Sequence, residues 1–203
     1  MTFADRTIAE FLDDVAASAV TPSGGAVAAV GGACGAALCE MVCIHTIEKD
    51  DYADVRDELS AVRAELETHR ARLLELADED SIAVDELQAA FAASTDEGRA
   101  ELIDEKSRRT ADVPLDIAEA CLDVLDHAKV VTANGNRNAV ADAGTGAFLA
   151  HAALKAAVFT VESNLQLIEE PAVVEALVER LTEIDEQSDE ALTQVRANIE
   201  AAI

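Results

Sequence analysis

Two long segments that almost lack charge constrain this chain more than any other feature. In Ala26–Ile47 the only Asp, Glu, Lys or Arg is Glu40, and Ala139–Ile168 contains only three such residues. The whole chain nevertheless has 41 acidic against 15 basic residues, a formal net charge of −26. Because acidic residues stay at the surface unless they are paired, the fold has to place these two segments inside an acidic exterior.

A pair of membrane spans is the alternative interpretation of these segments, because about 20 apolar residues suffice to cross a bilayer. Glu40 would lie within the first span, and the three glycines of residues 31–35 lower helix propensity unless close packing compensates. We therefore predict a buried helix and no membrane association. Its edge of Ala28, Gly32 and Ala36 is expected to let another backbone approach closely, for example that of a second subunit.

The remaining segments show the 3,4 spacing of apolar residues that is typical of amphipathic helices, without the alternation of strands. We predict helices over Phe3–Ala17 and Ala53–Ala92, a shorter one ending at Asp112, another opened by Pro114 and ending near Asn134, and a last one with a stripe from Val174 to Ile199. Residues 93–98 are predicted to form a connection.

The predicted architecture is all-α, with residues 1–203 as a single-domain helical bundle. Two small-residue-rich helices are expected at its centre, surrounded by amphipathic ones. Two such apolar helices present more surface than one chain of this length can cover, so we predict a homodimer.

The composition also excludes some classes of function. An acidic surface repels nucleic acid, because binding depends on Lys and Arg that neutralise phosphates. Abundant carboxylates with only four lysines are typical of a protein that works in concentrated salt, which screens self-repulsion, so we predict a halophilic source. The N-terminus has no secretion signal, and the four cysteines are predicted to be buried free thiols rather than metal ligands, which favours a reducing cytoplasm.

Asp80 is the first candidate for chemistry. It interrupts the apolar stripe of the predicted helix over residues 53–92, and a carboxylate there must be paired, hydrogen-bonded, protonated or next to a cavity. The alternative is that the helix breaks at Asp78–Ser81 and leaves Asp80 as a solvated cap. Both interpretations stay open from sequence.

Asp142 is the second candidate, one turn into the second apolar segment and just after the loop Asn134–Asn138. A helix N-terminus stabilises anions, so Asp142 either caps the helix or faces a ligand, and Asn138 has the same two interpretations. The segment Thr21–Gly25 is a glycine-rich entry to a helix whose backbone could approach a ligand closely. It lacks the residues of a nucleotide-binding loop, and no metal-ligand or nucleophile pattern is present.

Several blocks, in this order, resemble the cyclodeaminase/cyclohydrolase family of folate enzymes. They are Phe11–Asp14, Thr21–Ala29, Thr46–Ile47 with Lys49 and Tyr52, Asp80, Pro114, Gly135–Gly144 and Asn164–Leu165. The likeness covers nearly the whole chain. Ser23, Ala26 and Val84 depart from the residues common in the family.

The resemblance implies an all-helical homodimer that binds a reduced folate as substrate and needs no prosthetic group or metal. It implies Asp80 and Asp142 as proton-transfer groups or anchors of the pterin, and Asn138 and Asn164 as residues that orient the substrate. The entry segment with Pro22, Gly24 and Gly25 would complete the substrate site. Lys49 and Arg137 are the bases nearest to family motifs for the negatively charged glutamate tail.

Two folate reactions fit the resemblance, since both pass through a tetrahedral carbon between N5 and N10 and need only proton transfers on a fixed substrate. Hydrolysis of 5,10-methenyltetrahydrofolate to 10-formyltetrahydrofolate is preferred for a chain without a fused formiminotransferase domain. Cyclodeamination of 5-formiminotetrahydrofolate, which releases ammonia, is the first alternative. A non-catalytic helical assembly protein is the alternative from another class.

Overall fold

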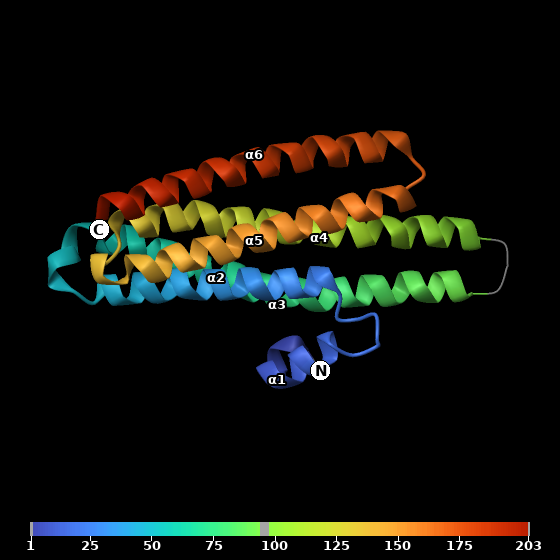
Figure 1. The fold of residues 1–203 in the computed structure, drawn as a ribbon, viewed down its shortest axis with the longest axis horizontal. Coiled ribbons are helices and arrows are strands. Elements are labelled where there is room, and N and C mark those ends of the chain that lie inside the picture. The colour runs from blue at the N-terminus through green and yellow to red at the C-terminus, as the bar shows by residue number, and fades with distance from the viewer. Residues whose placement is uncertain (1, 94–97, 203) are drawn as a thin grey trace.

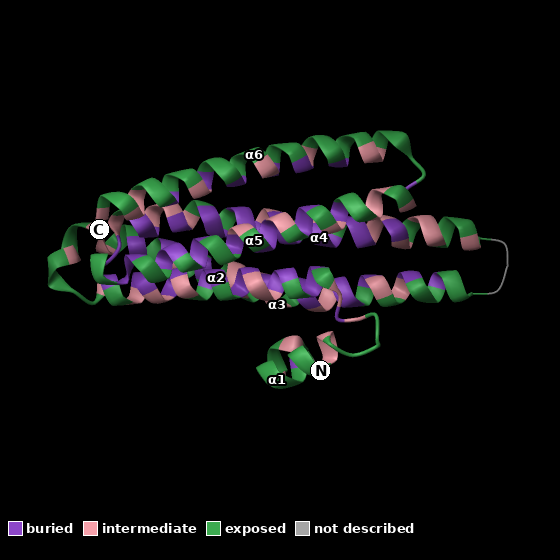
Figure 2. Cartoon of the chain, in the orientation of Figure 1, coloured by how far each residue is buried: buried purple, intermediate pink, exposed green. Residues whose placement is uncertain are grey.

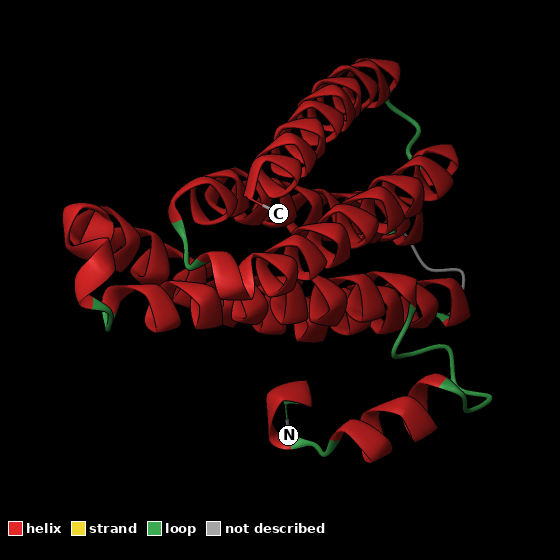
Figure 3. Ribbon diagram, turned by 60° about the vertical axis from the view of Figure 1, so that its left-hand side comes forward, coloured by secondary structure: helices red, strands yellow, loops and turns green. Residues whose placement is uncertain are grey.

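The order of the helices follows the apolar periodicity of the sequence. A computed structural model describes residues 2–93 and 98–202, and every regular element among these residues is helical (Figures 1 and 3). The α-helices are α1 (Ile8–Val15), α2 (Gly24–Ile47), α3 (Arg56–Ala92), α4 (Arg99–Asn134), α5 (Val140–Asn164) and α6 (Pro171–Ala202). Short 3-10 helices cover Phe3–Asp5, Asp50–Val55, Arg137–Ala139 and Leu165–Leu167. The all-α prediction is confirmed, whereas residues 94–97 of the predicted connection lie outside the described residues.

The apolar helices α2 and α5 pack side by side and antiparallel, and both also contact amphipathic helices, α2 with α3 and α5 with α4 and α6. Gly35 and Gly146 make the closest approach, since a Cβ on Gly35 would lie 2.6 Å from the Gly146 carbonyl oxygen. The edge of Ala28, Gly32 and Ala36 is buried within the chain, and a Cβ on Gly32 would meet Sγ of Cys121 in α4. The close contact expected at this edge is therefore made with other helices of the same chain and not with a second subunit.

The two apolar helices are not surrounded by the others, which corrects the predicted arrangement. Each has one face packed in the core and one face at the surface of the chain, visible as green segments on α2 and α5 in Figure 2. Both helices are long and apolar enough to cross a membrane, yet half of each most apolar window is buried inside the bundle. The other half of each window is therefore a largely apolar surface on the outside of the chain.

Helix α4 is one continuous helix, although two helices separated before Pro114 are predicted from sequence. Proline lacks the N–H that would donate to the carbonyl of Thr110, four residues earlier. In the structure Nδ2 of Asn164 donates to that carbonyl at 2.6 Å. A side chain from α5 therefore supplies the missing donor, and this contact could not be seen in the local sequence.

Helix α3 is also continuous, which decides between the two interpretations of Asp80. The helix does not break at Asp78–Ser81. Asp80 is part of α3, and the residue is buried between α3 and its neighbours. The apolar stripe is confirmed from Leu59 to Leu87, but Phe91 at its end is 47% exposed. The solvated-cap interpretation of Asp80 is therefore wrong.

The N-terminal residues form an arm that lies apart from the bundle axis (Figures 1 and 3). Helix α1 begins at a capping box in which Thr7 and Glu10 exchange hydrogen bonds, and Phe11 packs edge-on against Phe3. The backbone N–H of Phe3 donates to Oδ1 of Asp78 at 2.9 Å, which ties the arm to α3. Of the cysteines, Cys39, Cys43 and Cys121 are buried as predicted, whereas Cys34 is exposed on the outer face of α2.

Candidate functional site

Asp80 is a buried carboxylate held against the first turn of α2. Its Oδ2 accepts hydrogen bonds from Oγ of Ser23 at 2.6 Å and from the backbone N–H of Ala26 at 2.9 Å. Asp80 is only 2% exposed. Among the described residues Oδ1 receives no hydrogen bond, so one oxygen of the carboxylate is fixed and the other keeps its capacity to accept or carry a proton.

The sequence around Ser23 folds locally to suit this carboxylate. Ser23 is the N-cap residue of α2, but its hydroxyl makes no capping bond within the helix because it donates to Asp80. Asp80 instead satisfies the N–H of the third helical residue, Ala26, as an N-cap side chain ordinarily would. The carboxylate also lies at the positive end of the α2 dipole, which stabilises a negative charge.

Gly25 makes this approach possible. A Cβ at Gly25 would collide with Oδ1 of Asp80 and would lie 2.6 Å from its Cγ. The neighbouring Gly24 is exposed, and a Cβ there would meet nothing within 4 Å. Of the two glycines predicted to contact a ligand, Gly25 is thus required by the contact with Asp80.

Burial raises the pKa of the Asp80 carboxyl above its ordinary value of 3.8, and the hydrogen bonds from Ser23 and Ala26 oppose this rise. A raised pKa brings an aspartic acid closer to the range in which it exchanges protons near neutral pH. A buried carboxyl with a raised pKa is a candidate for proton transfer.

A cleft of about 510 Å³ lies between the N-terminal arm and α3, and Asp80 itself is not among the residues that line it. Its walls include Pro22, which precedes the α2 N-terminus, and Ser81, which follows Asp80 in α3. Acidic side chains line it from α1 and α3, at Asp14, Asp78 and Asp85. The volume is in the range of small-molecule sites. We call it the arm cleft.

The asparagine loop lies at the other end of α2 and is held by its main chain. The backbone N–H of Asn136 donates to Oγ1 of Thr46 at 2.8 Å, and its side-chain amide donates to the carbonyl of His45. The backbone N–H of Arg137 donates to the hydroxyl of Tyr52 at 3.2 Å. Asn136 is 5% exposed, so these bonds anchor the loop to the end of α2.

The side chains predicted to bind substrate in this region point outward. Lys49, Arg137, Asn138 and Asp142 are all exposed. Asp142 is not buried in the single chain: Ala143 and Gly144 occupy the buried side of α5, and Asp142 lies next to them on its outer side. A second cleft, of about 380 Å³, is lined there by Arg137, Tyr52 and Asn134 among others.

The two groups of predicted residues do not meet within one chain. Two contacts show where the groups lie along α2. Asp80 contacts Ala26 near the start of α2, whereas the start of α5 lies beside Cys39, whose Sγ contacts the carbonyl of Ala143. Thirteen residues of α2 separate these points, or ~20 Å at 1.5 Å per residue. Asp80 and Asp142 of the same chain therefore cannot act on one atom.

Asn164 has a structural contact that accounts for it without a ligand, since its amide donates to the Thr110 carbonyl beside Pro114. No role is predicted from sequence for Ser23, Thr46 or Tyr52, yet these three residues hold the candidate groups in place. A serine directly before Gly-Gly is a capping pattern that could have been noticed. The partners of Thr46 and Tyr52 lie some 85–90 residues away and leave no local signal.

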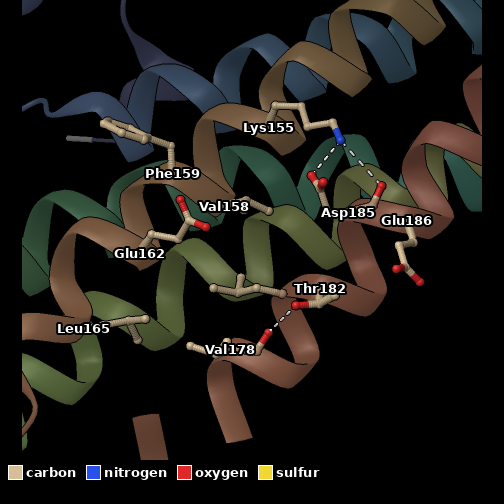
Figure 4. A pocket seen from close by; sticks show the side chains of 10 residues that line it. Lys155, Val158, Phe159, Glu162, Leu165, Val178, Thr182, Asp185 and Glu186 are labelled. Atoms are coloured by element: carbon tan, nitrogen blue, oxygen red, sulfur yellow. Dashed lines mark hydrogen bonds and ion pairs between the residues drawn. The ribbon is translucent and has the colours of Figure 1, made fainter. Parts of the chain in front are cut away.

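A third cleft, of about 620 Å³, lies between α5 and α6 (Figure 4). Its cation, Lys155, is already bound by Asp185 at 2.6 Å and by Asp189 at 2.8 Å. None of the residues predicted to bind substrate lines it. In residues 2–93 and 98–202, no group of three or more His, Cys, Asp and Glu side chains is arranged to hold a metal ion. The absence of a metal or prosthetic group stays a prediction.

Comparisons with known proteins identify the family to which the chain belongs. Residues 7–183 match the family model described as formiminotransferase-cyclodeaminase. The chain is 38% identical over 186 residues to a methenyltetrahydrofolate cyclohydrolase of Methylorubrum extorquens, covering 89% of this chain and 88% of that protein. It superimposes on a formiminotetrahydrofolate cyclodeaminase of Thermotoga maritima with a TM-score of 0.91 and 29% identity, covering 98% of each chain. This chain belongs to the formiminotransferase-cyclodeaminase family.

Proposed function

We propose that this protein is a methenyltetrahydrofolate cyclohydrolase. The observation that carries the proposal is the buried Asp80 carboxyl, fixed at the start of α2, in a chain 38% identical to a protein of that name. In the reaction a water oxygen adds to the methenyl carbon between N5 and N10. The C–N5 bond then breaks, N5 takes one proton of the water, and the other proton is released.

The proton transfers of this reaction suit Asp80. As a carboxylate it accepts a proton from the attacking water, and as a carboxylic acid it returns one to N5, two roles that a raised pKa brings close together. Its Oδ2 stays bound to Ser23 and Ala26 throughout, so Oδ1 is the oxygen that changes its proton. General acid–base catalysis of this kind contributes ~100- to 10,000-fold to a rate.

The arm cleft suits the pterin end of the substrate. The amino-pyrimidine edge of a reduced pterin presents several N–H donors, and Asp78 and Asp85 supply carboxylate acceptors in the cleft wall. Oδ1 of Asp78 already accepts from the N–H of Phe3, which holds the arm in place as the opposite wall.

Formiminotetrahydrofolate cyclodeaminase activity is the alternative, and the Thermotoga maritima neighbour of that name favours it. There N10 adds to the formimino carbon and ammonia leaves, and Asp80 would donate a proton to the departing nitrogen. The enzyme would then act as a lyase. Both relatives bear the names of folate enzymes, which argues against a non-catalytic assembly protein.

Two assays on the purified chain test the proposal and separate the two reactions. A cyclohydrolase removes the near-ultraviolet absorbance of 5,10-methenyltetrahydrofolate faster than the buffer does, and it releases no ammonia. A cyclodeaminase releases ammonia from 5-formiminotetrahydrofolate. If folded protein catalyses neither reaction, the enzymatic proposal is rejected.

We propose further that two chains form a homodimer through the outer faces of α2 and α5. The exposed or half-buried residues at the centre of this face carry no charge, although the protein carries a formal charge of −26. They are Val27, Gly31, Cys34, Ala37, Leu38 and Met41 of α2 and Thr145, Leu149, Ala152, Ala156 and Phe159 of α5. An uncharged face of this length, on so acidic a surface, is typical of an interface between subunits.

A twofold axis perpendicular to α2 would unite the two groups of candidate residues. In that arrangement the start of α2 in one subunit lies beside the end of α2 and the start of α5 in its partner. Asp80 and Pro22 of one chain would then share a site with Asn138, Arg137, Lys49 and Asp142 of the other. This arrangement gives the exposed side chains of the asparagine loop a ligand to face.

Complementation tests the shared site. Asp80→Asn and Asn138→Ala are each expected to lower activity as homodimers, and sedimentation should give the mass of two chains. When the two variants are unfolded and refolded together, mixed dimers regain one site free of both substitutions, so activity should rise well above that of either variant. Mixed dimers without any such gain would contradict the shared site.

The formal net charge of −26 predicts how the stability of the protein depends on salt. We propose a cytoplasmic protein from a salt-rich cell that binds a tetrahydrofolate derivative, without a prosthetic group and without affinity for nucleic acid or membranes. Mutual repulsion of the surplus carboxylates should destabilise the fold at low ionic strength. The melting temperature should therefore rise steeply between dilute buffer and molar KCl, and a flat salt profile would contradict halophilic adaptation.

A further inference from the structure

The hydroxyl of Ser23 binds Asp80 rather than its own helix. A serine at the N-cap ordinarily accepts a hydrogen bond from an N–H of the first helical turn. Ser23 makes no such bond, because Oδ2 of Asp80 accepts the N–H of Ala26 in its place. Oγ of Ser23 lies 2.6 Å from the same oxygen, and among the described residues this is its only side-chain hydrogen bond. The hydroxyl therefore serves the carboxylate, and α2 does not depend on it for capping.

This hydrogen bond is of a kind that depends on charge. A length of 2.6 Å is within the range for a hydroxyl that donates to an ionised carboxylate. Such a bond stabilises the ionised carboxylate more than the protonated form, whose oxygens are weaker acceptors. Asp80 is buried, so water can solvate its charge only poorly. The hydroxyl of Ser23 and the N–H of Ala26 replace that water.

No cation compensates the burial of Asp80. Burial raises the pKa of this carboxyl, and only the hydrogen bonds from Ser23 and Ala26 lower it. Burial also raises the pKa of Asp112 and of Asp116, but there the charge of an arginine opposes the rise. The ionisation of Asp80 thus depends on two neutral donors, and of these only the Ser23 hydroxyl belongs to a side chain.

The charged residues around Asp80 have other partners. The part of α2 that follows Ala26 carries no charge before Glu40. The charged residues next to Asp80 in α3 and those of the arm cleft are Asp78, bound by the N–H of Phe3, Glu79, paired with Arg72, Asp85, bound by Thr21, and Arg6, paired with Asp14. None of them contributes to the pKa shift of Asp80.

The same hydroxyl also orients the carboxyl. Two donors on Oδ2 restrict rotation about the Cβ–Cγ bond of Asp80, so Oδ1 keeps one direction. Proton transfer requires a base at hydrogen-bond distance from the reacting water and in line with it. We propose, on the basis of the proposed function, that Ser23 is a positioning residue of the reaction, whose hydroxyl keeps Asp80 ionised as the base and fixes the direction of its free oxygen.

The pH profile of kcat/KM tests this role, with the full chain and 5,10-methenyltetrahydrofolate as substrate. Ser23→Ala should shift the acidic limb of the profile upward by about one pH unit, a ~10-fold loss at the lower pH values, because Asp80 then binds its proton more tightly. Ser23→Thr keeps a hydroxyl and should keep the limb of the wild type. A uniform fall in rate with an unmoved limb would overturn the proposal.

Ser60→Ala is the matched control for the loss of a serine hydroxyl. Ser60 is exposed in α3, and its hydroxyl bonds only to the Arg56 carbonyl of the preceding turn. This variant should leave the whole pH profile unchanged. A shift of the acidic limb equal to that of Ser23→Ala would show that the effect does not depend on the contact with Asp80.

A double-mutant cycle shows whether Ser23 acts through Asp80. In an Asp80→Asn background the base is already absent, so Ser23→Ala should not lower the residual kcat further. An equal loss in both backgrounds would mean that Ser23 acts on the substrate or on the fold, which contradicts the proposal.

A measurement without turnover keeps the test independent of the assay. In protein labelled with carbon-13 at the aspartate carboxyl groups, the resonance that Asp80→Asn lacks belongs to Asp80. Its titration midpoint should rise by about one pH unit in Ser23→Ala. An unmoved midpoint in folded Ser23→Ala protein would overturn the inference. If the wild type catalyses neither folate reaction, only the proposed function is rejected, since this titration still shows whether Ser23 controls the carboxyl.

Discussion

The two ends of α2 hold their polar groups in opposite ways. At its start, Asp80 is enclosed by Ser23, Gly25 and Ala26 of the same chain. At its end, the main chain of the asparagine loop is anchored through Thr46 and Tyr52, while the side chains of the loop project outward. The first end thus holds its carboxylate by contacts within one chain, which the proposed proton-transfer role of Asp80 requires. The second is a rigid platform whose side chains need another molecule, which the proposed twofold arrangement supplies.

Asp80→Asn is the change with the largest expected effect. Asparagine still accepts the N–H of Ala26 and serves well as a cap, so the fold should remain. Turnover should fall ~100- to 10,000-fold because the proton-transfer group is lost. Asp142→Asn, at the exposed end, should cause a smaller loss under the same assay. Equal losses in both variants would remove the distinction between the two ends.

Gly25→Ala tests the enclosed end by packing. The new Cβ would force the Asp80 carboxylate to move, which should cost ~1–3 kcal/mol of unfolding free energy and also lower turnover. Gly24→Ala is the matched control because its Cβ meets nothing within 4 Å, and its stability should change by less than ~0.5 kcal/mol. Urea denaturation measures both, and equal stabilities of the two variants would show that the contact is not tight.

Thr46→Val tests the anchored end. Removing the hydroxyl leaves the buried N–H of Asn136 without an acceptor, which should cost ~1–2 kcal/mol. Thr68→Val is the control, since Thr68 is exposed and its hydroxyl bonds only to the Ala64 carbonyl of its own helix. Hydrogen exchange at residues 135–139 should quicken in the first variant and not in the second. Unaltered exchange would mean that the loop is held by other contacts.

A double-mutant cycle decides whether Asn164 belongs to the site or to the scaffold. Asn164→Ala should cost ~1 kcal/mol because the Thr110 carbonyl loses its donor. In a Pro114→Ala background the restored N–H of residue 114 can satisfy that carbonyl, so the same change should cost much less. Additive costs would refute this structural role. Unchanged kcat in the double variant would remove Asn164 from the substrate site.

The pH dependence of stability gives the smallest expected effect. Since burial raises the pKa of Asp80, the folded state binds this proton more tightly than the unfolded state does. Stability should therefore fall as pH rises from the ordinary aspartate pKa through the raised value, and Asp80→Asn should lack this loss. The melting temperature of the variant minus that of the wild type should increase upward from about pH 4. A difference independent of pH would mean that ionised Asp80 costs nothing to bury.

Much of the fold could be predicted because helix periodicity depends on residues close in sequence. The apolar runs that became α2 and α5 and the stripe of α6 are confirmed within a few residues. The prediction of two helices around Pro114 failed because the donor to Thr110 comes from Asn164, 54 residues away. Whether Asp142 lies on the covered or the exposed side of α5 could not be predicted, because the position of a residue on an apolar helix does not tell which face another helix covers.

For the candidate site, residue types were predictable and their grouping was not. Asp80 could be identified as a candidate because it is an acidic residue in an otherwise apolar helical stripe. The order of the motifs indicates the family. Whether Asp80 is buried, what it contacts and which other candidates lie near it depend on pairs separated by more than 50 residues.

The sequence by itself determined an all-helical chain with two nearly uncharged helices, an acidic exterior and a family of folate enzymes, because composition, periodicity and motif order are properties of neighbouring residues. Only the tertiary structure decided that Asp80 caps α2 from another helix, that Asn164 completes the hydrogen bonds of α4, and that the hydroxyl of Ser23 donates to Asp80. These contacts arise where helices distant in sequence are packed at close range, and no local pattern encodes which side chains then meet.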